Sequence, residues 1–163
     1  MYVKNTLNPI ERKSLATCTR EIIQVDRNCK NAVHLKLLLI YRNPRITAAD
    51  DDEFYTMLEK FLLSQHECVI MGDFILPSIN WTLERPTPAP GDKLIQLLAD
   101  NNLTKHVQKT TRQNNILDLV MSTEAELIVN LNITDKIGDH QVITFSIKTE
   151  KGNIASEKKQ KQL

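Results

Sequence analysis

An excess of charge of one sign is missing from this sequence. Its 21 Lys and Arg residues nearly balance its 20 Asp and Glu residues, for a formal net charge of +1. This balance excludes a protein held to nucleic acid by bulk positive charge, so any nucleic-acid binding has to be local. A disordered or collagen-like chain is excluded too, because 41% of the 163 residues are hydrophobic and 25% are charged. The length predicts one domain.

Cysteines and long apolar runs are also scarce. Cys18, Cys29 and Cys68 are odd in number and show no CxxC spacing, which excludes a zinc framework and predicts reduced, packed thiols. A metal fragment at His66, Glu67 and Cys68 is less favoured than a strand in which Cys serves as a small hydrophobic residue. No run approaches the roughly 20 apolar residues of a membrane span, and the start lacks the apolar region of a signal peptide. We expect no membrane partner and a nuclear or cytoplasmic location.

Hydrophobic periodicity predicts strands that alternate with helices. Residues 32–41 are typical of a buried strand, and a helix is expected to begin at Thr47, with apolar residues every three or four positions up to Leu62. A second helix is predicted from Gly91 to about Asn101. Further strands are expected at 21–25, 68–74, 116–121, 127–133 and 141–147.

The domain is expected to end before the last polar stretch. Residues 1–148 carry all the periodic segments, and 86–90 are expected to be extended. Residues 149–163 are rich in lysine and have no apolar period, so they are predicted to form a solvated tail.

Three acidic residues stand where a strand favours none. Asp73 closes an apolar run, Asp118 lies inside another, and Asp139 precedes His140 just before a third. A buried carboxylate without a partner costs several kcal/mol, so a His or a cation is expected nearby, and His140 is the natural candidate. The alternative is that each acid caps a turn and that His140 is a surface histidine, since perturbed groups also occur in structural networks.

Four short motifs in order strengthen the first interpretation. They are YRNP at 41–44, GDFILPSINW at 72–81, NILDLV at 115–120 and GDH at 138–140. They closely resemble the YRPP, GDFNLPDIDW, NNILDLVLT and SDH segments of the endonuclease/exonuclease/phosphatase superfamily. The match is closest to the endonuclease domain of CR1-like LINE (non-LTR) retrotransposons.

The resemblance implies a fold and an activity. The fold is an α/β sandwich of two sheets in four layers, which this chain would form without the opening strands. The activity is hydrolysis of the DNA backbone with Mg²⁺ or Mn²⁺, a nick that exposes a 3′ hydroxyl for a downstream reverse transcriptase domain. Such hydrolysis needs a positioned water, charge stabilisation and help for the leaving oxygen, which carboxylates, a histidine and a hard cation supply.

The same resemblance implies a role for each matching residue. Asp73 would orient or deprotonate the attacking water, and Asp139 would be a metal ligand. His140 would contact the scissile phosphate or act as acid and base, with Asp118 orienting it. Tyr41 would donate a hydrogen bond to a phosphate oxygen.

Two arginines and two departures complete the predicted site. Arg42 and Arg112 are expected to contact phosphate, although exposed arginines are often only solvated. The asparagine of GDFN is Ile75 here, and the serine of SDH is Gly138. Loss of one preorganised donor typically costs about 10²–10³ in rate. The family's opening strands, with an Asn and a metal-binding Glu, are not found in the chain, so weak metal binding and a weak or inactive isolated chain are expected.

Three functions therefore compete. The first is a metal-dependent endonuclease domain. The second is an inactive remnant or a module that binds nucleic acid or protein. The third, unrelated to the resemblance, is an α/β interaction domain whose acidic residues are all caps. Upstream sequence that supplies an Asn and a Glu on strands would favour the enzyme.

Overall fold

The computed structural model describes residues 9–12, 20–28, 34–64, 66–81 and 91–148. Cys18, Cys29, the stretch 86–90 and the tail 149–163 lie outside this part of the chain, so the predictions made for them stay predictions. Within it, Cys68 is a fully buried, free thiol, as predicted. No described helix is long and apolar enough to cross a membrane.

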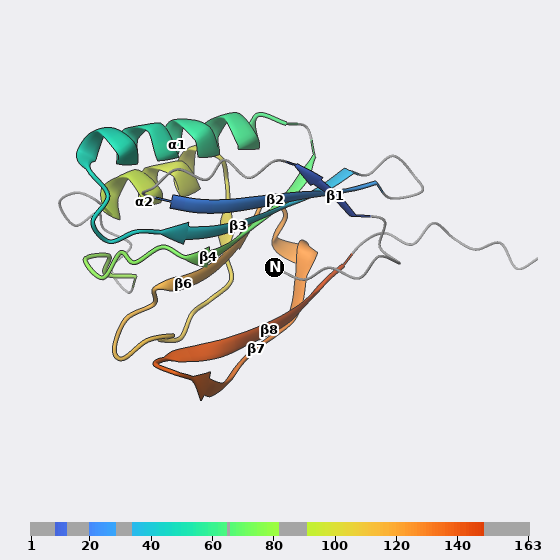
Figure 1. Cartoon of the computed structure of the whole chain (residues 1–163). Coiled ribbons are helices and arrows are strands. Elements are labelled where there is room, and N and C mark those ends of the chain that lie inside the picture. Colours follow the sequence, from blue (N-terminus) through green and yellow to red (C-terminus); the bar gives the residue numbers. More distant parts are fainter. Residues whose placement is uncertain (1–8, 13–19, 29–33, 65, 82–90, 149–163) are drawn as a thin grey trace, which may run out of the picture.

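A six-stranded sheet forms the centre of the fold (Figure 1). Its order is β1-β2-β3-β4-β6-β5. Only β3 and β4 are parallel neighbours, and they are joined through a helix, as a parallel crossover requires. The strands are β1 (Pro9–Arg12), β2 (Arg20–Asn28), β3 (His34–Arg42), β4 (Glu67–Asp73), β5 (Thr104–Lys105) and β6 (Asp118–Ser122).

Two helices, α1 (Ala48–Leu62) and α2 (Gly91–Asp100), cover one face of this sheet (Figure 1). Helix α1 begins at Ala48, one residue after the predicted start, and Thr47 is its N-cap, because its side-chain oxygen accepts the backbone N–H of Asp50. The apolar face of α1 packs on alternate residues of β3 and β4 in one core cluster, which includes Phe54, Leu58, Leu38, Ile40 and Ile70.

A second sheet faces the opposite side (Figure 1). It pairs β7 (Ile128–Ile137) with β8 (His140–Ile147) after a short 3-10 helix, η2 (Ala125–Leu127). Its apolar residues meet the larger sheet in a second cluster that includes Leu35, Val69, Val120, Ile133 and Phe145. The predicted mixed α/β fold with two sheets is confirmed. The described residues form three of the four predicted layers: helices, large sheet and small sheet.

Most predicted elements are present with shifted ends. β1 and β5 were not predicted, because four and two residues carry too little periodicity. β7 runs to Ile137, four residues past its prediction, since its end is paired with β8 through Ile137 and His140. Pairing with a neighbour overrides the weak strand preference of Asp135 and Lys136.

Candidate active site

Strand register brings the predicted acidic residues into one row. Tyr41 on β3 is the partner of Asp73 on β4, and Asp73 is the partner of Asp118 on β6. Paired residues of neighbouring strands share a face, and side chains alternate along a strand. The side chains of this row therefore lie on the same face of the sheet as those of Leu35, Val69 and Val120, which is the face that packs against β7 and β8. Tyr41, at 44% exposure, lies at the open end.

A two-residue turn delivers His140 to this row. Ile137 pairs with His140, so Gly138 and Asp139 form the loop of the β7–β8 hairpin. Gly138 has φ +67°, and two-residue hairpin turns favour glycine at such a first position. The change from the family's serine to Gly138 thus suits the turn that carries Asp139 and His140.

Thr111 fastens the hairpin to β6. Its fully buried hydroxyl accepts the backbone N–H groups of Leu117 and Asp118, at 3.1 and 3.0 Å. Its carbonyl accepts the N–H of Gln141 at 2.8 Å. Thr111 therefore positions both Asp118 and the start of β8. Thr111 was not among the predicted site residues, because a single threonine before a turn carries no distinguishing pattern.

His140 stands between three carboxylates. Its Nδ1 lies 3.1 and 2.9 Å from the two oxygens of Asp118. Its Nε2 lies 3.8 Å from an oxygen of Asp73 and 3.7 Å from an oxygen of Asp139. The expectation that these four residues converge, with Asp118 nearest to His140, is confirmed. Their chemical roles stay predictions.

The surroundings favour an extra proton on this group of residues. The hydrogen bond to Asp118 raises the pKa of His140 above its ordinary value, although desolvation opposes it. Burial raises the pKa of Asp73, and the neighbouring Asp118 carboxylate raises it further. A base and an acid with shifted pKa values side by side are typical of catalytic sites.

Arg112 joins the cluster through Asp139. Its Nη2 lies 2.5 Å from an oxygen of Asp139, at the exposed rim. Desolvation raises the pKa of Asp139, but its own backbone N–H and the Arg112 guanidinium lower it by more, so the pKa falls below its ordinary value. Arg112 therefore lies at the exposed rim of the cluster, paired with Asp139, and its contact with phosphate stays a prediction.

Arg42 is a correction to the predicted site. Because it follows Tyr41 on β3, its side chain lies on the opposite face of the sheet, against the helices. Its guanidinium is buried, donating from Nε to Asp51 at 2.9 Å and from Nη1 to the carbonyl of Phe74 at 3.4 Å. The structure does not bring Arg42 to the cluster, so the prediction of a phosphate contact there is not supported.

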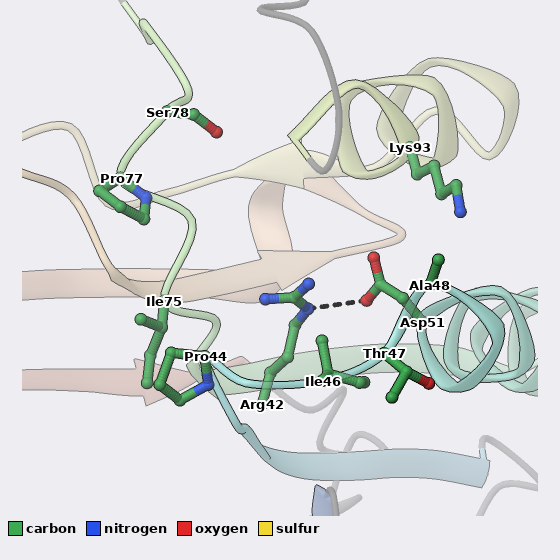
Figure 2. A pocket seen from close by; sticks show the side chains of 10 residues that line it. All are labelled: Arg42, Pro44, Ile46, Thr47, Ala48, Asp51, Ile75, Pro77, Ser78 and Lys93. Atoms are coloured by element: carbon green, nitrogen blue, oxygen red, sulfur yellow. Dashed lines mark hydrogen bonds and ion pairs between the residues drawn. The ribbon is translucent and has the colours of Figure 1, made fainter.

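Ile75 is also directed away from the cluster. Its N–H donates to Asp73 at 3.2 Å. Its side chain lies beside Pro44 and lines a cavity with Arg42 (Figure 2). Its φ is +46°, a conformation in which a branched side chain is strained and asparagine or glycine is tolerated.

The cluster fits a divalent cation. Asp73, Asp118 and His140 each offer one ligand atom within 4.8 Å of the others. This is the sole such group in the described part of the chain, and it does not include His66, Glu67 and Cys68. Carboxylate oxygens suit Mg²⁺ and Mn²⁺, and an imidazole nitrogen suits the transition metals.

Comparison with known protein families identifies the family of this chain. A profile of the endonuclease-reverse transcriptase family matches residues 35–144, which include all four predicted motifs. The chain belongs to this family of the endonuclease/exonuclease/phosphatase superfamily. The superfamily predicted from the motifs is therefore confirmed, whereas the kinship with CR1-like LINE elements stays a prediction. A search of curated protein sequences found no match.

Solved structures, two of them described as endonuclease/exonuclease/phosphatase proteins, show the same fold. A family protein from Leptotrichia buccalis C-1013-b has 14% identity and a TM-score of 0.56, over 83% of this chain and 58% of that one. The human Nocturnin catalytic domain has 13% identity and a TM-score of 0.52, over 86% and 60%. A protein from Beutenbergia cavernae DSM 12333 has 13% identity and a TM-score of 0.54, over 78% and 39%. This chain therefore spans no more than 60% of these solved chains.

Proposed function

We propose that this chain carries the active site of a metal-dependent DNA endonuclease of the LINE retrotransposon kind. One observation supports this most: Asp118 holds His140 through Nδ1, so that Nε2 faces Asp73 and Asp139. Phosphodiester hydrolysis needs a general acid and a general base, and an oriented imidazole beside a carboxylate of raised pKa can serve in these roles. The family's description joins the endonuclease to a reverse transcriptase, which supports a nick that exposes a primer 3′ hydroxyl.

Each residue has a role that follows from its place. Asp118 fixes the tautomer with the proton on Nδ1 and stabilises the imidazolium. His140 presents Nε2 to the scissile phosphate and, as the imidazolium, donates its Nε2 proton to the leaving 3′ oxygen. Asp73, whose raised pKa makes it a better base than an ordinary aspartate, orients and deprotonates the water. Tyr41 and Arg112 stand at the exposed rim, where each would donate to a phosphate oxygen.

A divalent cation would complete the chemistry. Asp139 is its proposed ligand, as the resemblance implies, and Asp73 would contribute from the group of three ligand atoms that lie within 4.8 Å of one another. When bound, Mg²⁺ or Mn²⁺ neutralises charge on the phosphoryl oxygens and assists the leaving oxygen. Few ligands in the described residues predict weak binding, because Mg²⁺ needs carboxylates together with waters and substrate phosphates.

A catalytically inactive binding module is the alternative. Ile75 favours it, because a hydrocarbon replaces the asparagine of the resembled motif and its side chain faces another cavity. The endonuclease is expected to nick DNA slowly, whereas the binding module is expected not to nick it at all. The distinction lies in whether any nicking depends on His140. Action on chromosomal DNA would place the protein in the nucleus, one of the two predicted locations.

A plasmid assay tests the proposal. The full chain is incubated with supercoiled DNA in Mn²⁺ or Mg²⁺, and the relaxed product is followed. We expect slow nicking that falls by about 100-fold in His140→Ala. His66→Ala, a histidine outside the cluster, is the matched control and should nick like the parent. Equal rates for His140→Ala and the parent overturn the proposal. DNA binding without any nicking establishes the binding module instead.

A further inference from the structure

Arg112 and Asp139 form an ion pair at the rim of the cluster. The Nη2 of Arg112 lies 2.5 Å from Oδ2 of Asp139, and the two side chains are 34% and 57% exposed. Exposed ion pairs contribute little to stability, so their partners can be exchanged at little cost. This pair can therefore open when a stronger ligand for either member binds.

The backbone of Arg112 is fixed to the hairpin that carries Asp139. Its N–H donates to the carbonyl of Asn115 at 3.1 Å, and its carbonyl accepts the N–H of Asn115 at 3.0 Å. The neighbouring carbonyl of Thr111 accepts the N–H of Gln141 at 2.8 Å, which joins this turn to the start of β8. Opening the pair therefore moves the guanidinium and leaves Asp139 in place.

Positive groups face both oxygens of Asp139. Oδ2 is held by Arg112, and Oδ1 lies 3.7 Å from Nε2 of His140, which is positive when protonated. A cation that binds at Oδ2 has to displace the guanidinium, and a cation at Oδ1 lies beside the imidazolium. Like charges at such separations repel each other. The proposed metal ligand is therefore already neutralised by side chains of this chain.

A phosphate is the ligand that suits Arg112 in exchange. The guanidinium is a planar fork of donors that matches two phosphate oxygens at once. The scissile phosphate is proposed to lie at Nε2 of His140, which is itself 3.7 Å from Asp139. The old and the new partner of the guanidinium would thus lie at the same rim. One movement of the Arg112 side chain would release Asp139 and bind the phosphate.

We infer that Arg112 competes with the cation for Asp139, and that a DNA phosphate relieves this competition by binding the guanidinium. The chain would then hold its cation weakly when alone and more tightly on DNA. Because coupling between two ligands is reciprocal, the cation would strengthen DNA binding by the same factor. The inference rests on the proposed function, since it takes Asp139 to be the metal ligand and DNA to be the substrate.

Mn²⁺ binding to the full chain without DNA tests the competition. Free Mn²⁺ is followed by its EPR signal at neutral pH and constant ionic strength. We expect Arg112→Gln to bind Mn²⁺ about fivefold more tightly than the parent, which is the upper range for an exposed ion pair. Lys109→Gln removes a charge from an exposed position of the same segment and should change the affinity by less than about twofold. Melting temperatures check that each variant folds.

A double-mutant cycle shows whether the effect passes through Asp139. Asp139→Asn should bind Mn²⁺ more weakly than the parent, and adding Arg112→Gln to it should leave that weaker affinity unchanged. A general effect of charge would instead tighten binding in both backgrounds. Equal tightening in both backgrounds, no tightening in Arg112→Gln, or full affinity in Asp139→Asn each overturns the inference.

DNA binding tests the exchange. Fluorescence anisotropy of a labelled duplex is measured in EDTA and in Ca²⁺ at one ionic strength, and a gel verifies that the DNA stays intact. We expect Ca²⁺ to tighten DNA binding by the parent and by Lys109→Gln about fivefold more than by Arg112→Gln. The same tightening in all three chains overturns the exchange.

The plasmid assay separates this inference from the proposed function. Tighter Mn²⁺ binding through Asp139 without any nicking supports the competition and removes the endonuclease. Nicking that depends on His140, together with equal Mn²⁺ affinities of the parent and Arg112→Gln, supports the endonuclease and removes the competition.

Discussion

Asp118 holds His140 by both carboxylate oxygens, which lie 3.1 and 2.9 Å from Nδ1. The two residues are far apart in the chain, and Thr111 fixes their distance by bonding the backbone of Asp118 and of the residue after His140. This pair leaves Nε2 as the one imidazole atom open to the other carboxylates. The same hydrogen bond raises the pKa of His140 above its ordinary value.

Asp118→Asn should lower the pKa of His140 toward the ordinary value. Asparagine keeps the shape of the partner but removes the charge that favours the imidazolium. The raised pKa of His140 in the folded state stabilises the fold below pH 6.5, and this contribution is lost as the pH rises through the raised value. The free energy of unfolding of the variant should therefore fall below that of the parent by the largest amount at pH values under 6.5. NMR titration of the imidazole measures the shift, and an unchanged pKa would contradict the arrangement.

Asp73→Asn should stabilise the protein at neutral pH while reducing nicking. A carboxyl whose pKa is raised in the folded state favours folding below its ordinary value of 3.8, and that contribution is lost as the pH rises through the folded pKa. The ionised form is thus the costly one, and asparagine removes it. We expect a melting temperature higher by a few degrees and a rate lower by about 100-fold. Asp139→Asn, at an exposed carboxylate, should show no such gain.

At position 75, glycine should give a more stable protein than alanine, which reverses the order found within helices. At φ +46° a Cβ is unfavourable, so Ile75→Gly should be more stable than Ile75→Ala by about 1 kcal/mol. At Glu59, an exposed site within α1, alanine should instead be more stable than glycine by about 1 kcal/mol. Urea unfolding of the four variants checks both signs. The same order at both sites would show that Ile75 is unstrained.

Gly72 and Gly138 should respond differently to alanine. A Cβ at Gly72 would lie 1.9 Å from the backbone oxygen of Ile40, so β3 and β4 would have to separate. We expect Gly72→Ala to cost about 3 kcal/mol or to prevent folding. At Gly138 a Cβ meets nothing within 4 Å, and only its φ of +67° opposes the change, at about 1–2 kcal/mol. Thermal melting compares the two, and equal losses would contradict this packing.

Patterns within single segments of the sequence were enough to predict much of the fold and of the candidate site. Helical periodicity after Thr47, the apolar runs of β3 and β4 and the four ordered motifs predicted the α/β class, the superfamily and the residues of the cluster. Those features depend on side-chain spacing along one segment, which a single sequence displays. Asp73, Asp118 and His140 stood out because each breaks or borders an apolar run, where a carboxylate needs a partner.

Tertiary structure alone decided which side of the sheet each residue serves. Tyr41 and Arg42 are adjacent in one motif, yet alternation along β3 sends Tyr41 toward the cluster and Arg42 to Asp51 under the helices. Thr111 acquired its role only through hydrogen bonds to two segments distant in the chain. The sequence likewise gives no sign of the left-handed backbone conformation at Ile75. Register and strand pairing join residues far apart in the chain, so their consequences appear only once the sheet has formed.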